Sequence, residues 1–429
     1  VTIVTDPFLT LSRGTQKSQG LTDMCFVTVP HPLGMISKEE VNAKVDAAFD
    51  DIVKAATAWT PSKEKQDAQV KPYPAKRFKF SGTYADVNDM FQKRKWSLSL
   101  PIVPPTVDKV AAMLKGTKRN PAEVLWVVPP RQGMLTVELV AALGVMAGAK
   151  PEHMPLLIAT VEAMADPVAA WRGPTTTTAA TVPVFFISGP IIEKLKLNPG
   201  TGTAGGENPV TNALGYFVNL VGDVVGGSVP PNFDKSTHGS SADLVAMVFT
   251  ENAKENPWKT TYAEEAGFKP GDSIVTHFSA YLGNANIDHD SKTGQRLLTT
   301  LSTGLLGSAS GLASCLADYD ATYAINNKVS FAFIVLCPEH AATIAKDFPD
   351  QRAARDFMRE TAAMPYKFYS QETCVPGKDF GPYDENTFIP RFKKTESIKF
   401  FVSGGPGKQS QIWVPFPQVF KPVSKKIAE

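Results

Sequence analysis

The chain has 429 residues and a formal net charge of +2, from 44 Lys and Arg against 42 Asp and Glu. This near balance gives no electrostatic footprint for nucleic acid. Hydrophobic content of 43% and charged content of 20% indicate a globular protein, and the length predicts two or three domains. No apolar run is long enough to span a membrane, no secretory leader is visible, and the four cysteines form no CxxC pair. We therefore expect a cytoplasmic protein without a structural zinc site or a disulfide framework.

Residues 1–59 predict part of an α/β domain, a partial Rossmann-like layer. Two β-branched or apolar runs, Val1–Thr5 and Cys25–Val29, are typical of buried strands. A capping box at Ser37 then begins an amphipathic helix that extends to about Ala58. The first strand needs a neighbour, which either later residues or another polypeptide must supply.

Residues 60–95 have poor periodicity and are rich in Lys, Pro, Gln and Asp, so we expect an extended linker or arm whose aromatic residues dock on a neighbour. Residues 96–429 alternate strands with helices, which predicts a larger α/β domain. Its predicted strands are Val124–Val128, Val182–Ile187, Leu244–Phe249, Ser273–Phe278, Val329–Leu336 and Ile398–Val402. Its predicted later helices are 209–224, 293–318, 338–347 and 351–363.

Two polar residues follow predicted strands after one or two prolines, where α/β sheets place ligand-binding groups. His31 lies between prolines that fix the backbone and would pre-aim its imidazole. The alternative is a histidine that caps a turn. Arg131 follows Val124–Val128 and is suited to bind a carboxylate or phosphate, or else to form a surface or inter-domain ion pair.

Two glycine-rich loops are candidate anion sites. Residues 200–206 precede a predicted helix start, and residues 404–408 follow a strand, with Lys408 able to neutralise an anion. Neither loop has the spacing of a dinucleotide-binding motif or a P-loop. A flexible loop is the alternative for both.

Polar residues also flank the strand predicted at 244–249. His238 precedes it, and Glu251 and Asn252 follow it. The strand spans roughly 20 Å, so His238 and Glu251 lie near opposite ends and a metal site built from these two alone is disfavoured. His238 can instead meet Arg131 or the 200–206 loop.

The sequence offers few nucleophiles. The G-x-S-x-G motif fails because Ala309 occupies the place of the serine. Cys337 lies between a strand and a predicted helix start, where a thiolate can be stabilised, although an inert buried thiol is the alternative. His277 lies in a strand pattern and is expected to be a satisfied core or edge histidine.

The segments resemble the UGSC family, bacterial proteins named for a (U/C)-Gly-Ser-Cys motif in which U is selenocysteine. Thr5–Phe8, Val29–Gly34 and Glu39–Val41 resemble the C-terminal half of the UGSC domain. The rest resembles a larger domain found with or near it, through the stretches Leu100–Thr106, Val127–Arg131, Val145–Gly148, Thr237–Gly239, Glu251–Asn252, Pro257–Trp258 and Pro338–Ala341. The family motif itself is absent, and Thr175–Thr178 stand where relatives carry a histidine after threonines.

The resemblance implies redox chemistry through a selenol or thiol that this chain lacks. We therefore expect an oxidoreductase subunit that acts on a small, anionic molecule and is an enzyme only as part of a hetero-oligomer. The reactive residue would belong to a smaller polypeptide that completes the N-terminal domain. The candidate catalytic residues are His31, His238 and Cys337, and the candidate substrate-binding residues are Asp6, Arg131, Glu251, Asn252 and Lys408.

Two other functions remain open at this point. One is a metal-dependent lyase or hydrolase that uses His238 with Glu251 or Glu255 brought in by folding, and its metal is unknown. The other is a binding or scaffold subunit without chemistry of its own, which the lack of any strong catalytic motif favours.

Overall fold

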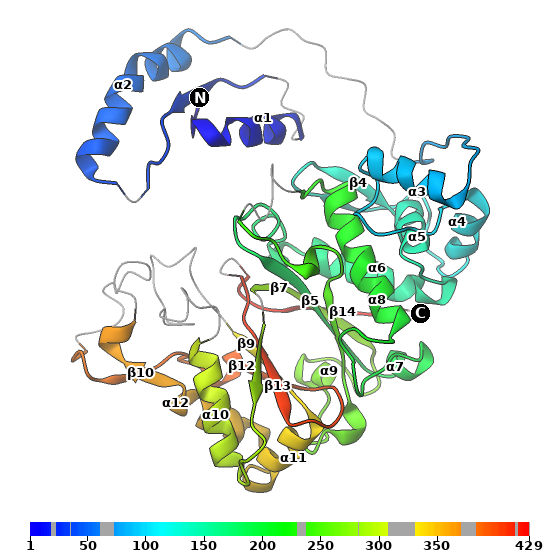
Figure 1. Cartoon of the computed structure of the whole chain (residues 1–429), viewed down its shortest axis with the longest axis vertical. Coiled ribbons are helices and arrows are strands. Elements are labelled where there is room, and N and C mark those ends of the chain that lie inside the picture. The colour runs from blue at the N-terminus through cyan, green and yellow to red at the C-terminus, as the bar shows by residue number, and fades with distance from the viewer. Residues whose placement is uncertain are drawn as a thin grey trace.

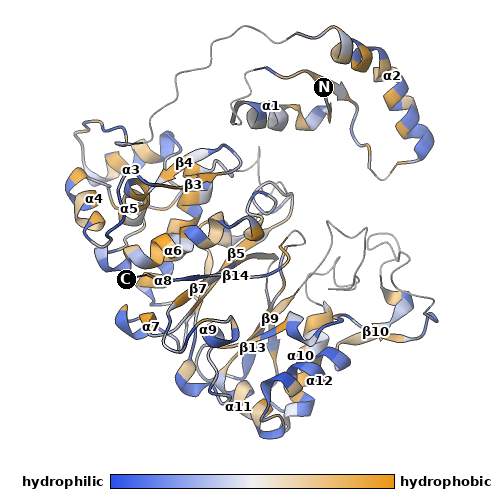
Figure 2. Ribbon diagram, turned by 180° about the vertical axis from the view of Figure 1, so that it is seen from behind, coloured by the Kyte–Doolittle hydropathy of each residue, from blue (hydrophilic) through white to orange (hydrophobic). Residues whose placement is uncertain are grey.

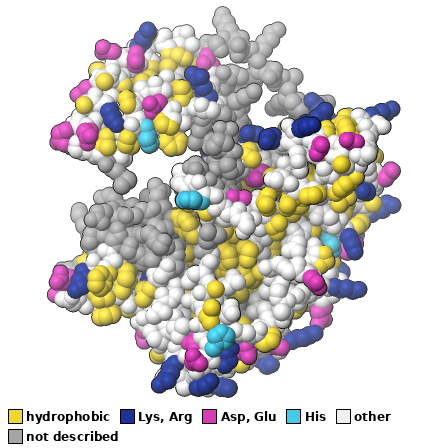
Figure 3. Space-filling view, in the orientation of Figure 1, with side chains coloured by type: hydrophobic (Ala, Val, Ile, Leu, Met, Phe, Trp, Pro, Cys, Tyr) yellow, Lys and Arg dark blue, Asp and Glu magenta, His cyan; other side chains and the backbone are white. Residues whose placement is uncertain are grey.

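The computed structural model describes residues 1–18, 23–34, 36–60, 73–229, 237–281, 283–307, 331–369, 383–416 and 419–428. Helices and mixed sheets alternate along the chain, which confirms the predicted α/β class (Figure 1). Positive and negative side chains are interspersed on the face drawn in Figure 3, as the small net charge predicts. Among the described residues, no helix combines the length and apolar character that crossing a membrane requires.

The N-terminal unit is a β-α-β-α arrangement that lies apart from the rest in Figure 1. Its elements are β1 (Thr2–Thr5), α1 (Leu9–Ser18), β2 (Phe26–Val29) and α2 (Lys38–Thr57). β1 and β2 are parallel, so later residues do supply a neighbour for the first strand. The sequence indicated no helix between the strands, because the α1 segment contains a glycine and only two large apolar residues.

The expected arm at 60–95 is not extended throughout. Its last part forms α3 (Tyr84–Lys93), which a capping box begins at Thr83 and which buries Phe91 in the core of the large domain. Nearer its start, the backbone N–H of Ala75 donates to Glu138 at 2.8 Å, so this stretch docks on α5. Residues 61–72 of the predicted arm lie outside the described part of the chain.

The large domain is built on two four-stranded sheets. The first has the order β14-β7-β5-β6 and the second the order β12-β9-β13-β8. The strands of the first are β14 (Val423–Lys426), β7 (Ile274–Tyr281), β5 (Thr181–Ser188) and β6 (Met247–Thr250). Those of the second are β12 (Ile398–Val402), β9 (Ala332–Leu336), β13 (Gln409–Trp413) and β8 (Asn284–Ile287).

Helices cover the outer face of each sheet, which gives four layers. On the first sheet lie α6 (Met154–Ala165) and α8 (Pro209–Asn219), and α5 (Val137–Met146) packs against both of these helices. On the second lie α10 (Gly294–Gly307), α11 (Pro338–Asp347) and α12 (Gln351–Thr361). The outward surfaces of α11 and α12 are largely hydrophilic in Figure 2. The remaining elements are α4 (Val107–Leu114), β3 (Val124–Val128), β4 (Gly133–Thr136), α7 (Ile191–Lys194), α9 (Tyr262–Glu265), β10 (Ala363–Pro365) and β11 (Phe388–Pro390).

The inner faces of the two sheets meet through aromatic side chains. The rings of Phe186 and Phe333 stack with centroids 4.4 Å apart, and Phe401 contacts Phe186 edge-on at 4.8 Å. Trp413 meets Phe249 edge-on at 5.9 Å. Offset and edge-on aromatic pairs add to the free energy gained by burying their area, so this layer is the main cohesion between the sheets.

Both sheets repeat one pattern of strand directions. In the first, β5 and β6 are parallel, β7 is antiparallel to β5, and β14 is antiparallel to β7. In the second, β9 and β12 are parallel, β13 is antiparallel to β9, and β8 is antiparallel to β13. The sequence shows no repeat of fixed period, so this likeness is one of topology.

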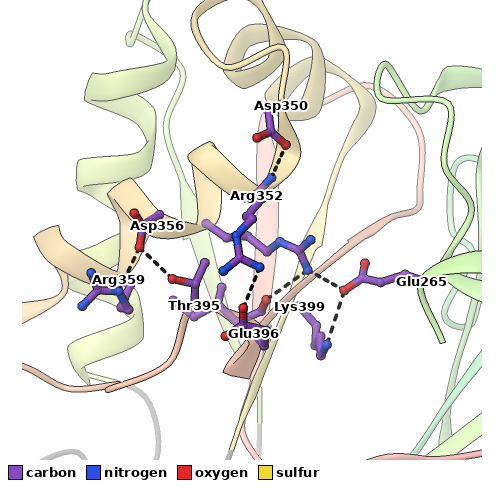
Figure 4. A network of polar contacts seen from close by, with 10 residues as sticks. Glu265, Asp350, Arg352, Asp356, Arg359, Thr395, Glu396 and Lys399 are labelled. Carbon is purple, nitrogen blue, oxygen red and sulfur yellow. Dashed lines mark hydrogen bonds and ion pairs between the residues drawn. The ribbon is translucent and has the colours of Figure 1, made fainter. Parts of the chain in front are cut away.

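Ion pairs also join the part of the large domain built on the first sheet to the part built on the second (Figure 4). Glu265 of α9 accepts from Arg355 of α12 and lies 3.4 Å from Nζ of Lys399 on β12. Nearby, Asp356 accepts hydrogen bonds from Arg359 Nε at 3.0 Å and from Thr395 Oγ1 at 2.7 Å. Because the Glu265 and Arg355 side chains are largely buried, removing Glu265 would leave the Arg355 charge without its carboxylate partner.

His277 is a buried core histidine on β7, as expected, but it is only half satisfied. Its Nδ1 lies 3.2 Å from the Val184 carbonyl and its ring stacks on Phe185 at 4.5 Å, while Nε2 has no hydrogen-bond partner among the residues that the structure describes. Burial lowers the pKa of His277 to about 3, below its unfolded value of about 6.5. Its contribution to stability is therefore present above pH 6.5 and is lost as the pH falls from 6.5 towards 3.

We expect His277→Phe to reduce the acid sensitivity of folding. Between pH 6 and pH 4, the free energy of unfolding should fall more steeply in the wild type, by about 1.4 kcal/mol per pH unit. Urea unfolding at several pH values measures both slopes. His289→Gln, at an exposed position, is the matched control and should keep the wild-type slope. Parallel curves for wild type and His277→Phe would contradict the prediction.

Candidate functional site

Asp6 and His31 lie together at the carboxyl ends of β1 and β2. The two strands are parallel and pair Thr5 with Val29, so the residues that follow them emerge at the same edge. Oδ1 of Asp6 accepts from the backbone N–H of His31 at 3.0 Å. The structure thus brings together two of the residues that the sequence analysis selected, at the edge where α/β sheets bind ligands.

The imidazole of His31 is held from two sides and is exposed to solvent. Its Nδ1 lies 3.2 Å from Thr5 Oγ1, and its ring centroid lies 5.7 Å from that of Phe8. Nε2 makes no hydrogen bond to the described residues. Lys44 Nζ donates to the carbonyl of Pro32 at 2.7 Å and ties this loop to α2. This arrangement can present one ring nitrogen to a reacting group beside the sheet edge.

A second candidate site is a cavity of about 760 Å³ at the carboxyl ends of β5 and β6 in the large domain. Glu251 and Asn252, which follow β6, both line it. It therefore occupies the position outside parallel strand ends where ligands commonly bind.

Glu251 is almost fully buried and holds three elements together. It accepts hydrogen bonds from Ser188 Oγ, at the end of β5, and from the backbone N–H of Tyr262 at 2.7 Å, at the start of α9. Ser188 Oγ in turn accepts from the N–H of Ala263 at 3.2 Å. Burial raises the pKa of the Glu251 carboxyl, and the nearby Glu264 adds to that rise.

Asn252 connects this edge to the second sheet. Its backbone N–H donates to Val402 at 2.8 Å, and its Nδ2 donates to Gly404 at 3.1 Å. The loops at 200–206 and 404–408 also meet here, because the Gly404 N–H donates to Pro199 at 2.8 Å and a Cβ on Gly405 would lie 2.2 Å from Thr201 Oγ1. The fold thus places both predicted glycine loops side by side.

The 404–408 loop already binds an anion from within the chain. The carboxylate of Glu339 accepts from the N–H groups of Gly407 at 2.6 Å and Lys408 at 3.0 Å. Lys408 Nζ donates to the carbonyl of His289 at 3.0 Å. The anion-binding geometry expected for this loop is therefore used to fix the start of α11, and Lys408 is tied to a neighbouring loop.

Arg131 and His238 lie elsewhere, near the Thr175–Thr178 loop. The Arg131 N–H donates to Gly226 at 2.8 Å, and Ser228 Oγ donates to Thr175 at 2.9 Å. Thr237, which precedes the exposed His238, donates through Oγ1 to Thr178 at 2.7 Å. His238 precedes β6 and Glu251 follows it, as expected, so they do not share a site. The described residues contain no group of three or more His, Cys, Asp or Glu side chains arranged to hold a metal.

Cys337 is the N-cap residue of α11, as its position between strand and helix predicts, but it is 5% exposed. Burial raises the pKa of its thiol, which opposes formation of a thiolate. This environment favours the inert alternative.

Ser188 and Tyr262 are site residues that the sequence analysis missed. Ser188 directly follows the predicted strand Val182–Ile187 and precedes Gly189-Pro190, which is a usable signal. Tyr262 contributes its backbone N–H, and no side-chain pattern marks that role.

Glu251→Ala is expected to lower the free energy of unfolding by about 2–4 kcal/mol, because it leaves the buried Tyr262 N–H without an acceptor and vacates buried volume. Glu251→Gln should cost less, since its amide oxygen still accepts one hydrogen bond. Urea unfolding measures both. Glu255→Ala, on the exposed neighbour, should change stability by no more than about 0.5 kcal/mol. Similar losses in the Glu251→Ala and Glu255→Ala variants would show that Glu251 does not anchor this site.

Comparison with known proteins and protein families gives a match in the N-terminal unit. No curated protein matches the chain. The family model that matches is that of the UGSC family, over residues 1–58. The matched range contains β1, β2, α2 and the Asp6–His31 pair, so the resemblance read from Asp6-Pro7-Phe8 and His31–Gly34 is confirmed there. Over residues 1–58 the chain is therefore similar to the UGSC family.

Proposed function

We propose that this chain is a subunit of a thiol- or selenol-dependent oxidoreductase for a small, anionic molecule. Its reactive Cys or Sec belongs to a smaller companion polypeptide that pairs beside β1. The observation that carries the proposal is the Asp6–His31 pair at the carboxyl ends of a two-stranded parallel sheet whose β1 edge is unpaired among the described residues.

The β1 edge is suited to accept another strand. The N–H of Thr2 donates to the carbonyl of Cys25, which directly precedes β2, so in a parallel ladder the N–H and C=O groups of Ile3 point to the other side. The Ile3 side chain is 50% exposed, whereas Val27, its register partner on β2, is 6% exposed. Parallel sheets are normally covered on both faces. The face is covered over β2 and exposed over β1, which supports a missing neighbour beside β1.

Helix α2 also carries exposed apolar side chains. Its buried side chains, Ala48 and Ala55, pack over β2. Val45, Phe49 and Val53 recur every four residues along one flank of that buried face and are 38–57% exposed. A companion polypeptide that covered this flank would remove these side chains from water.

The proposed chemistry follows from the family motif, which provides two reactive groups, a selenol or thiol and a thiol. Together they would give two electrons and two protons to the substrate and close a selenylsulfide or disulfide. His31, held through Nδ1, would hold or transfer a proton through Nε2 at this edge. Asp6 would position the His31 backbone.

Native mass spectrometry of the particle purified from the organism that makes it tests the proposal. We expect a tightly held smaller polypeptide that contains the motif. Ile3→Pro should release it, because proline removes the outward N–H while the bonds of Thr2 and Val4 to β2 remain.

Ile3→Thr keeps that N–H and the β-branched shape, and therefore serves as the matched control that should retain the companion. A wild-type particle composed only of copies of this chain would contradict the proposal. So would equal retention of the companion by Ile3→Pro and Ile3→Thr.

A further inference from the structure

The cavity in the large domain has the features of a separate ligand site. Its lining comes from the turn after β5, from the residues after β6, from α9 and from the turn before β7. α7 and α9 lie at this end of the first sheet (Figure 1). Two connections, from β5 to β6 and from β6 to β7, therefore converge outside two parallel strand ends, and the cavity volume of about 760 Å³ suits a small molecule.

One wall of the cavity is apolar. It consists of Pro190, Ile192, Leu197 and Pro199, and the side chains of Ile192 and Leu197 are fixed because both residues are buried. Such a wall would bind the hydrocarbon part of a ligand by removing it from water.

The charged groups leave an excess of negative charge. Lys254 is paired with Glu193 at 2.9 Å, and Asp272 is paired with Lys426 at 2.5 Å. The charges within each pair cancel. The negative charges of Glu251 and Glu264 on the lining then exceed the positive charge of Lys196, whose side chain is exposed.

Glu264 and Glu251 lie close enough to influence each other. The Glu264 carboxylate accepts from the N–H and Oγ1 of Thr261, which lowers its pKa and keeps it charged. A cation placed between the two carboxylates would relieve their repulsion, whereas an anion would increase it.

We propose that this cavity binds a small molecule that carries a protonated amino group on an apolar body. The ammonium group would lie beside Glu251 and Glu264, and the apolar body would pack against Pro190 and Leu197. This site is distinct from the Asp6–His31 edge and does not depend on a companion polypeptide.

Three probes of equal chain length test the inference in calorimetric titrations of the full chain at neutral pH and low salt: n-pentylamine, pentan-1-ol and pentanoate. We expect saturable binding of pentylamine, weaker binding of pentanol and weakest binding of pentanoate. Binding of pentanoate as tight as that of pentylamine would overturn the inference. Absence of saturable pentylamine binding up to about 50 mM would also overturn it.

Glu264→Gln is the decisive variant, because glutamine preserves the capping box and removes only the charge. It should weaken pentylamine binding about threefold or more and leave pentanol binding unchanged. Glu360→Gln makes the same charge change at an exposed position on α12 and should leave pentylamine binding unchanged. Equal effects of these two substitutions would overturn the assignment of the ammonium group to this cavity.

Discussion

The contact between the inner faces of the two sheets is the constraint on which the large domain depends. Phe186, Phe333 and Phe401 fill the space between the sheets, and this layer fixes how the strand ends meet. The carboxyl ends of β6 and β12 are joined there by reciprocal bonds, Asn252 N–H to Val402 at 2.8 Å and Ser403 Oγ to Thr250 at 2.7 Å. Because these bonds hold both edges, loops that are about two hundred residues apart in sequence form one surface.

Much of this architecture is readable in the sequence where burial on both faces imposes continuous apolar runs. β3 and β12 have the predicted bounds, and β5 and α11 were predicted to within about one residue. The chemical candidates at strand ends were also informative, since Asp6 meets His31 and Glu251 lines a cavity. In both places the rule is geometric: parallel strands place the residues that follow them at one edge.

Other features depend on contacts that no local pattern reveals. β14 has the sequence Val-Ser-Lys-Lys and becomes a strand because β7 is there to pair with it. The 404–408 loop has the composition of an external anion site, yet Glu339 occupies its amides. Cys337 has the predicted position at a helix start, but burial in the protein interior raises the pKa of its thiol. In each case the structure or environment of the segment depends on residues that are distant in sequence.

The N-terminal unit and the large domain differ in how well each covers its own apolar surface. In the described part of the unit the fully buried apolar side chains are those of Val27, Val29, Ala48 and Ala55, two of which are alanines. Ordering each residue costs about 1–2 kcal/mol of backbone entropy, so such a core gives little surplus stability. The large domain instead surrounds both sheets with helices on one side and aromatic rings on the other. A unit that cannot cover its own sheet gains most from a neighbour at its open edge, and the Asp6–His31 pair lies at the end of that same edge.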